Sequence, residues 1–165
     1  MEADLIYDIG CNNGDDTDFY LRKGFRVLAL DADSSLCRDA IRRFPDEGAD
    51  GRLKVVNGLI SDVKSETAPF YLFEACSGWN TANPGFKALV ESAGHAAIKV
   101  DVPVVHIGDL LRQYGVPYYM KIDIEGHDLL ALKGLESFLE HHNDKPAYVS
   151  TEFDRHDLHV GLAHF

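Results

Sequence analysis

The chain alternates short apolar runs with segments whose apolar residues recur at helical spacing. The short runs predict buried strands, because glycine, proline or acidic residues bound them. Helix-like segments separate the runs, so the pattern favours a mostly parallel sheet with helices on its faces. Two further runs are expected outside this core, 70–73 as a hairpin extension and 98–105 as an edge strand. The core strands are expected at 4–9, 25–30, 53–56, 119–124 and 147–153.

Start and stop signals mark the helices between these runs. Ser34 can cap the second helix, and Asp109 can cap a short helix before Gly115. Asn83 and Pro84 mark another start, because proline suits the first helical position. The last helix carries a stripe of leucines that predicts one buried face. The expected helices are 16–23, 34–44, a segment from 84, 109–115 and 127–139.

The composition limits the class of protein. A chain of 165 residues, 45% of them hydrophobic, is expected to form a single domain, 1–165. Its net charge of −11 argues against nucleic acid or an anionic membrane as partners. No apolar run has the roughly 20 residues that a bilayer span needs, and the first residues lack a signal-peptide pattern. Three widely spaced cysteines favour free thiols and a cytoplasmic protein.

A glycine loop joins the first strand to the first helix. Such loops bind nucleotide cofactors at the carboxyl ends of parallel strands. A dinucleotide site needs glycine where this chain has Asn12, because backbone must approach a pyrophosphate there. Asp15 and Asp16 disfavour phosphate and suit a ligand with an ammonium group, although they can also act as helix caps only. S-adenosylmethionine is such a ligand. The loop residues expected to bind it are Asp8, Gly10, Asn12, Asn13 and Gly14.

Asp31 closes the second strand, roughly 20 residues after Gly10. In doubly wound folds this is the place of the acid that binds ribose hydroxyls, and a carboxylate can accept both protons of a cis-diol. Asp33 is a rival, but it can also cap the helix that follows. Ser61 and Asp62 follow the third strand and are expected to bind adenine, with a plain turn as the alternative.

Two longer motifs give a resemblance. The stretch from Tyr7 to Asp15 reads YDIGCNNGD, and the stretch from Met120 to Asp128 reads MKIDIEGHD, with Leu-Lys-Gly following. In these motifs the chain resembles the FkbM-type methyltransferases from about 5 to 152. The resemblance implies a Rossmann-like methyltransferase fold, S-adenosylmethionine as methyl donor, and O-methylation of a hydroxyl on a sugar or small molecule. The chain departs from the family pattern at Asp31-Ala32, where the family usually has Glu-Pro.

Charged residues occupy one face of the strand 119–124. Alternation places Lys121, Asp123 and Glu125 on one side, and a strand covered on both faces needs partners or a cleft for such charges. Asp123 and Glu125 stand at the carboxyl end, which borders the ligand crevice in this architecture. We expect one of them to accept the proton of the acceptor hydroxyl. The alternative is a structural network between the lysine and the carboxylates.

Other features favour no second site. The polar loop 77–81, with the one tryptophan, can touch an acceptor, but a surface loop explains it as well. The late histidines lack ligand spacing, so no metal is expected. Two functional alternatives stay open, a nicotinamide-dependent oxidoreductase and an inactive nucleoside-binding remnant.

The end of the chain suggests an incomplete sheet. Methyltransferases of this class usually have two more strands after the strand predicted at 147–153. The remaining residues suit only the opening of a helix, with Asp157 as its cap. We therefore expect a C-terminally incomplete doubly wound sheet. Its exposed last strand would allow association into a homo-oligomer.

Overall fold

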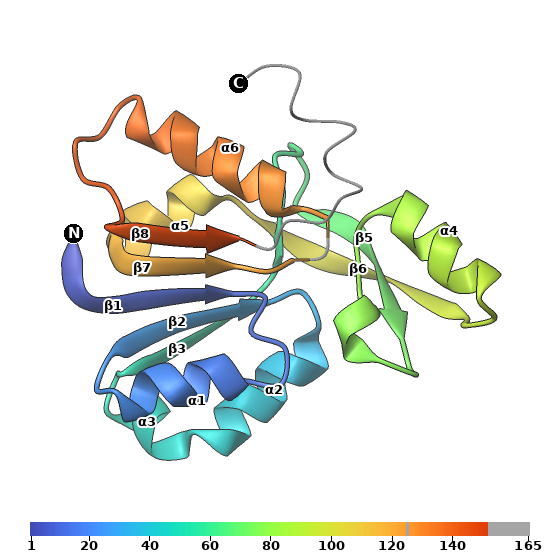
Figure 1. The fold of residues 1–165 in the computed structure, drawn as a ribbon, viewed down its shortest axis with the longest axis horizontal. Coiled ribbons are helices and arrows are strands. Elements are labelled where there is room, and N and C mark those ends of the chain that lie inside the picture. The colour runs from blue at the N-terminus through green and yellow to red at the C-terminus, as the bar shows by residue number, and fades with distance from the viewer. Residues whose placement is uncertain (125, 152–165) are drawn as a thin grey trace.

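A five-stranded parallel sheet forms the centre of the molecule (Figure 1). The computed structural model describes residues 1–124 and 126–151. The strands lie in the order β3-β2-β1-β7-β8, and each neighbouring pair runs parallel, which confirms the predicted sheet. Their bounds are β1 (Glu2–Ile9), β2 (Arg26–Asp31), β3 (Leu53–Asn57), β7 (Pro117–Ile122) and β8 (Tyr148–Thr151).

Helices cover both faces of this sheet (Figure 1). Their bounds are α1 (Asp15–Arg22), α2 (Ser34–Arg43), α3 (Pro45–Ala49), α5 (Ile107–Tyr114) and α6 (Asp128–Leu139). On one face Leu21 of α1 shares an apolar core with Val27 of β2, and on the other Leu135 of α6 shares one with Ile9 of β1. The fold is therefore α/β and Rossmann-like. None of the helices within the described ranges is long and apolar enough to cross a membrane.

A smaller sheet extends from the carboxyl end of the main one (Figure 1). It contains β4 (Leu59–Ile60), β5 (Thr67–Phe73) and β6 (Ala97–Val105), and the segment between β5 and β6 holds η1 (Ser77–Trp79) and α4 (Pro84–Ser92). The strand predicted at 70–73 is observed as part of β5, which pairs antiparallel with β6. The prediction of an edge strand at 98–105 is wrong, because β6 lies between β4 and β5. The exposed residues that alternate along β6 are typical of an edge strand. Its neighbour β4 has only two residues, which is too short for a periodic pattern that would reveal it in the sequence.

Two helices begin differently from the predicted caps. Asp33 caps α2, since its side chain accepts a hydrogen bond from the backbone N–H of Ser35 at 2.8 Å. Ser34 is the first helical residue instead of the cap. α5 begins at Ile107, and Asp109 lies inside its first turn, where its charge still suits the positive end of the helix dipole. Local sequence marks the neighbourhood of a helix start better than its first residue.

The strand predicted at 147–153 is observed as the shorter β8. It pairs with β7 and ends the strand order of the main sheet within the described residues. Tyr148 and Val149 are 60% and 39% exposed, so apolar side chains of β8 do meet solvent there. Association through this strand stays a prediction. The helix predicted from Asp157 lies outside the described residues.

The loop after β1 passes very close to the end of β7 at Gly10. The backbone N–H of Asp123 donates to the carbonyl of Ile9 at 2.9 Å, so the two segments stay paired beyond β7. Gly10 has φ +83°, and a Cβ built there would overlap the carbonyl oxygen of Asp123. Both the conformation and the close approach therefore require glycine.

We expect Gly10→Ala to destabilise the protein far more than Gly24→Ala. Gly24 also has a positive φ, of +87°, but a Cβ there would meet nothing within 4 Å. The control substitution should therefore cost only the conformational strain, about 1–2 kcal/mol. The Gly10 substitution adds a backbone overlap, so a cost of at least about twice that, or failure to fold, is expected. Urea unfolding measures both, and equal costs would contradict the close approach.

Candidate functional site

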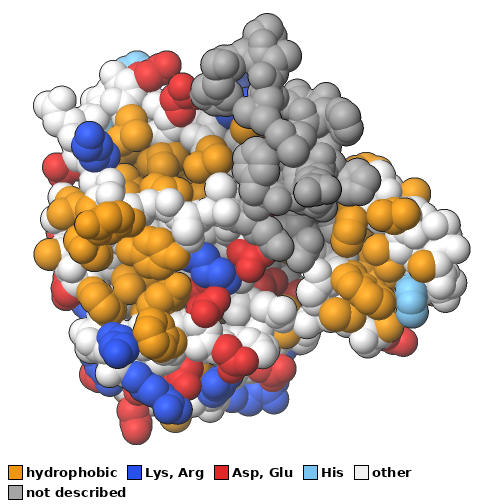
Figure 2. Space-filling view, viewed as in Figure 1, with side chains coloured by type: hydrophobic (Ala, Val, Ile, Leu, Met, Phe, Trp, Pro, Cys, Tyr) orange, Lys and Arg blue, Asp and Glu red, His pale blue; other side chains and the backbone are white. Residues whose placement is uncertain are grey.

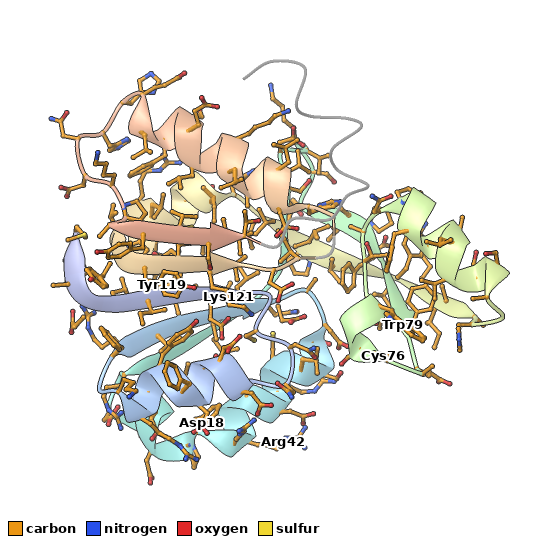
Figure 3. The ribbon with its side chains drawn as sticks, in the orientation of Figure 1. Asp18, Arg42, Cys76, Trp79, Tyr119 and Lys121 are labelled. Carbon is orange, nitrogen blue, oxygen red and sulfur yellow. The ribbon has the colours of Figure 1, made fainter. Side chains whose placement is uncertain are left out.

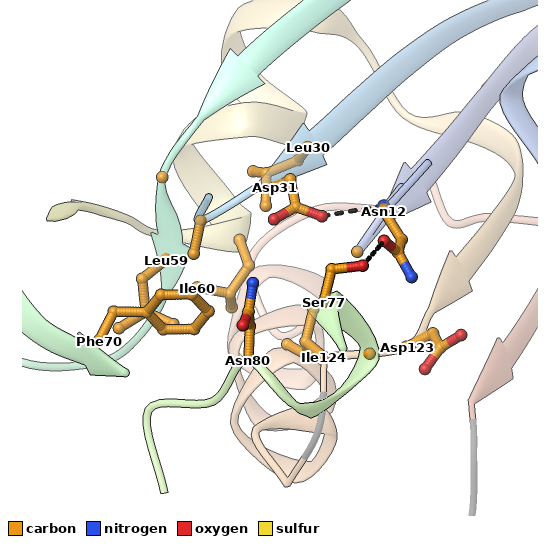
Figure 4. Close-up of a pocket in the computed structure, with 14 residues that line it drawn as sticks. Asn12, Leu30, Asp31, Leu59, Ile60, Phe70, Ser77, Asn80, Asp123 and Ile124 are labelled. Carbon is orange, nitrogen blue, oxygen red and sulfur yellow. Dashed lines mark hydrogen bonds between the residues drawn. The ribbon is translucent and has the colours of Figure 1, made fainter. Parts of the chain in front are cut away.

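A pocket of about 90 Å³, open to solvent, lies at the carboxyl ends of the strands (Figure 4). The chain runs outward through β1, β2 and β3 and then returns to the other side of β1 for β7. Ligands of open α/β sheets bind at such a switch point. The lining side chains come from the glycine loop, the end of β2, β4, β5, the η1 segment and the segment after β7.

Asp31 is the buried acid of this pocket, with 8% of its surface exposed. One carboxylate oxygen accepts the backbone N–H of Asn12 at 2.9 Å (Figure 4). The other accepts that of Asp33, also at 2.9 Å. Burial raises the pKa of Asp31 to about 6, although these two N–H groups lower it, and the charges of Asp33 and Asp8 raise it further. Each oxygen keeps a lone pair that a hydroxyl of a ligand can use.

The glycine loop is held against the end of β2. The backbone N–H groups of Gly10 and Cys11 both donate to the carbonyl of Leu30, at 2.8 and 3.0 Å. Asn12 has φ +44°, a left-handed conformation, and its N–H donates to Asp31. The Ser77 hydroxyl donates to the side-chain oxygen of Asn12 at 2.8 Å (Figure 4). Asn12 therefore joins the loop both to β2 and to the smaller sheet.

An apolar wall faces Asp31 across the pocket. Leu59 and Ile60 of β4 and Phe70 of β5 are buried and line it (Figure 4). Gly58 precedes them, and a Cβ there would overlap a methyl group of Val105 in β6. Because this glycine lets β4 lie against β6, the wall can stand close to the end of β2. An apolar ring of a ligand would pack well against this wall.

Asn80 ties the smaller sheet to the acids after β2. Its side-chain oxygen accepts the backbone N–H of Phe73 at 2.8 Å, and its amide group donates to Asp33 at 3.1 Å. Sequence reasoning did not assign this role, because the loop 77–81 is explained equally well as a polar surface loop. Asn80 and Asp33 are remote in sequence, and Asn80 reaches Asp33 because it is held beside β5 by its bond to Phe73 and by the bridge between Tyr71 and Thr81. The one feature of the sequence that pointed to Asn80 is its place directly after the single tryptophan.

A second polar cluster lies beside the pocket on the α1 side of the sheet. Asp8 is fully buried and accepts the hydroxyl of Thr17 at 2.6 Å. The Lys121 ammonium lies 3.6 Å from Asp8, 2.9 Å from Asp16 and 3.3 Å from Asp123. Burial raises the pKa of Asp8. It lowers that of Lys121, but the nearby carboxylates more than offset this, so the pKa of Lys121 lies above its ordinary value.

A comparison with protein-family models gives one match, to the methyltransferase FkbM domain, over residues 8–159. The match spans most of the chain, and it includes the glycine loop, Asp31 and the segment after β7. The chain belongs to the FkbM methyltransferase family. The family resemblance inferred from the sequence is thereby confirmed. A comparison with curated proteins found no match.

This FkbM methyltransferase domain brings together part of the predicted site. Gly10, Asn12, Asp31 and Asp123 line the pocket. Gly14 is the left-handed N-cap of α1 and does not line it. Thus the structure places the turn of the glycine loop and the predicted ribose acid on one cavity.

Other predicted residues lie elsewhere in the domain. Asp8 is buried on the α1 side, and the carbonyl of exposed Asn13 accepts a hydrogen bond from Arg43 at 2.8 Å. Ser61 and Asp62 line a separate hollow beside α5 and α6. Their predicted contact with the ligand stays a prediction. Glu125 lies outside the described residues.

In residues 1–124 and 126–151, no three or more histidine, cysteine or acidic side chains are grouped so that they could hold a metal ion.

The raised pKa of Asp31 gives this FkbM domain a specific pH dependence. The folded state favours the protonated acid, so the contribution of Asp31 to stability is fully present below its ordinary pKa of 3.8. It is lost as the pH rises to about 6. We expect the unfolding free energy of the parent, relative to Asp31→Asn, to fall by an amount on the order of 3 kcal/mol over that range. Urea unfolding between about pH 4 and 7 tests this. A difference that is constant with pH would show that Asp31 is better solvated than its burial implies.

Proposed function

We propose that this chain is an S-adenosylmethionine-dependent methyltransferase that methylates a hydroxyl of a small molecule or glycan. The observation that carries the proposal is the Asp31 carboxylate, fixed by two backbone N–H groups opposite an apolar wall. Family membership supports methyl transfer. The donor, the hydroxyl acceptor and the location of the protein in the cytoplasm are our inferences.

The pocket fits a nucleoside with an ammonium-bearing tail. Asp31 would accept the two ribose hydroxyls with its remaining lone pairs. The adenine ring would lie between the apolar residues Ile60 and Phe70. Asp123 also lines the pocket and would offer a carboxylate to a cationic tail. A pyrophosphate has no such fit, because Asn12 replaces the glycine that a dinucleotide loop needs at this position.

The donor, when bound, supplies an electrophilic methyl group on a sulfonium sulfur. The residues of this chain would bind and orient the two reactants and accept the proton that the acceptor hydroxyl loses. Asp123 is the described candidate for that proton, since it lines the pocket and its side chain is 36% exposed. Glu125 remains the second candidate from the sequence. The carboxylate would pass the proton to solvent after each transfer.

The first test is binding of the product S-adenosylhomocysteine. By isothermal titration calorimetry we expect a Kd in the low micromolar range or tighter. This corresponds to a favourable binding free energy on the order of 8 kcal/mol. Asp31→Ala should weaken binding by about 1–3 kcal/mol, because the ribose hydroxyls lose a charged acceptor. Asp39→Ala, on the exposed face of α2, is the matched control and should leave the Kd unchanged. If the parent shows no binding up to about a millimolar, the proposed donor is wrong.

Binding should also depend on pH through Asp31. The ribose hydroxyls donate to the ionised carboxylate, and the free protein binds a proton at this group with a pKa of about 6. The affinity for S-adenosylhomocysteine should therefore be constant above that pH. Below it, the affinity should fall by up to about tenfold per pH unit. Asp31→Asn, which cannot titrate, should show a weaker but flat profile. A parent profile as flat as that of the variant would argue against the ribose contact.

A further inference from the structure

Asp8 is an unusually buried charge for its surroundings. It is fully buried, and its Oδ2 accepts the hydroxyl of Thr17 at 2.6 Å. Its Oδ1 is also buried but has no hydrogen-bond partner within the described residues. Burying a carboxylate in this way is costly unless a cation lies near it. The cation that faces Oδ1 is the Lys121 ammonium, 3.6 Å away.

The pairing of β1 with β7 explains why the lysine lies there. Asp8 and Lys121 are opposite each other in the register of the two strands. Tyr119 and Lys121 lie on the same face of β7 (Figure 3), on the side of the sheet that α1 covers. In the space-filling view, acidic and basic side chains gather in the middle of this face, beside a hydrophobic area (Figure 2). The position of Lys121 is thus fixed by the backbone of the central sheet.

One ammonium group serves three carboxylates. Lys121 is close enough to hydrogen-bond Asp16 of α1 at 2.9 Å and Asp123 at 3.3 Å, and its side chain is 19% exposed. Asp123 follows the last residue of β7, and Lys121 is the cation paired with it among the described residues. With Lys121 removed, three negative charges would repel one another. The most exposed pair, Asp16 and Asp123, would then turn toward water.

We propose that Lys121 is a positioning residue that holds the Asp123 carboxylate at the rim of the pocket. The inference rests on the proposed function, because it takes Asp123 to face the bound donor and acceptor. Buried Asp8 on β1 and Asp16 on α1 both pair with the lysine ammonium and so fix its position. Lysine suits this place since a compact ammonium can contact several separate carboxylates, whereas the planar guanidinium of arginine favours one bidentate partner.

The test compares two lysine variants. Lys121→Met keeps most of the side-chain length but removes the charge, and Lys145→Met removes an exposed charge from the loop before β8, away from the pocket. Calorimetry with S-adenosylhomocysteine should give about tenfold weaker binding for Lys121→Met. Lys145→Met should bind within about twofold of the parent. Equal affinities of Lys121→Met and the parent would overturn the proposal.

A double variant separates a positioning role of Lys121 from a role in folding only. Lys121→Met leaves the charge of Asp8 buried and unpaired, so its urea midpoint should fall, and Asp8→Asn should restore much of that loss. The double variant should remain about tenfold weaker in binding, because Asp123 is still not held. Recovery of affinity together with stability would show that Lys121 acts only on folding. Absence of binding by the parent would instead refute the proposed donor, while the stability cycle still tests the Lys121–Asp8 coupling.

Discussion

The close approach of the β1 loop to the end of β7 is the constraint on which the site depends. Gly10 lies against the carbonyl of Asp123, and no side chain fits between them. This contact brings the glycine loop next to the segment that carries Asp123. The same loop binds Asp31 through the backbone N–H of Asn12. Asp31, the proposed ribose acid, and Asp123, the proposed proton acceptor, therefore line one pocket, although they lie far apart in the sequence.

Much of the main sheet could be predicted from the sequence, because its strands are short apolar runs and its loops carry glycine and acids. The place of Asp31 in the pocket could also be predicted, since the carboxyl ends of the strands border the ligand crevice in a doubly wound sheet. The position of β6 could not be predicted. Strand order in the smaller sheet depends on β4, whose two residues make no pattern of their own.

The site residues divide in a similar way. Gly10 and Asp31 belong to a local motif, and local motifs keep their geometry. Ser61 and Asp62 were assigned by their place after a strand, but the chain turns so that they line another hollow. Asn80 contributes through contacts with Phe73 and Asp33, both made by tertiary pairing. No spacing in the sequence reports such contacts.

The pocket takes one wall from outside the main sheet, and this has a consequence for engineering. β4 and β5 provide the apolar wall, and Asn80 and Ser77 fasten that unit to the acids and to the glycine loop. A chimera that exchanges the smaller sheet between relatives must therefore transfer 58–80 together with β6, which lies between β4 and β5. The segment with α4, from 84 to 96, carries none of these attachments, so loop grafting and library diversification can begin there.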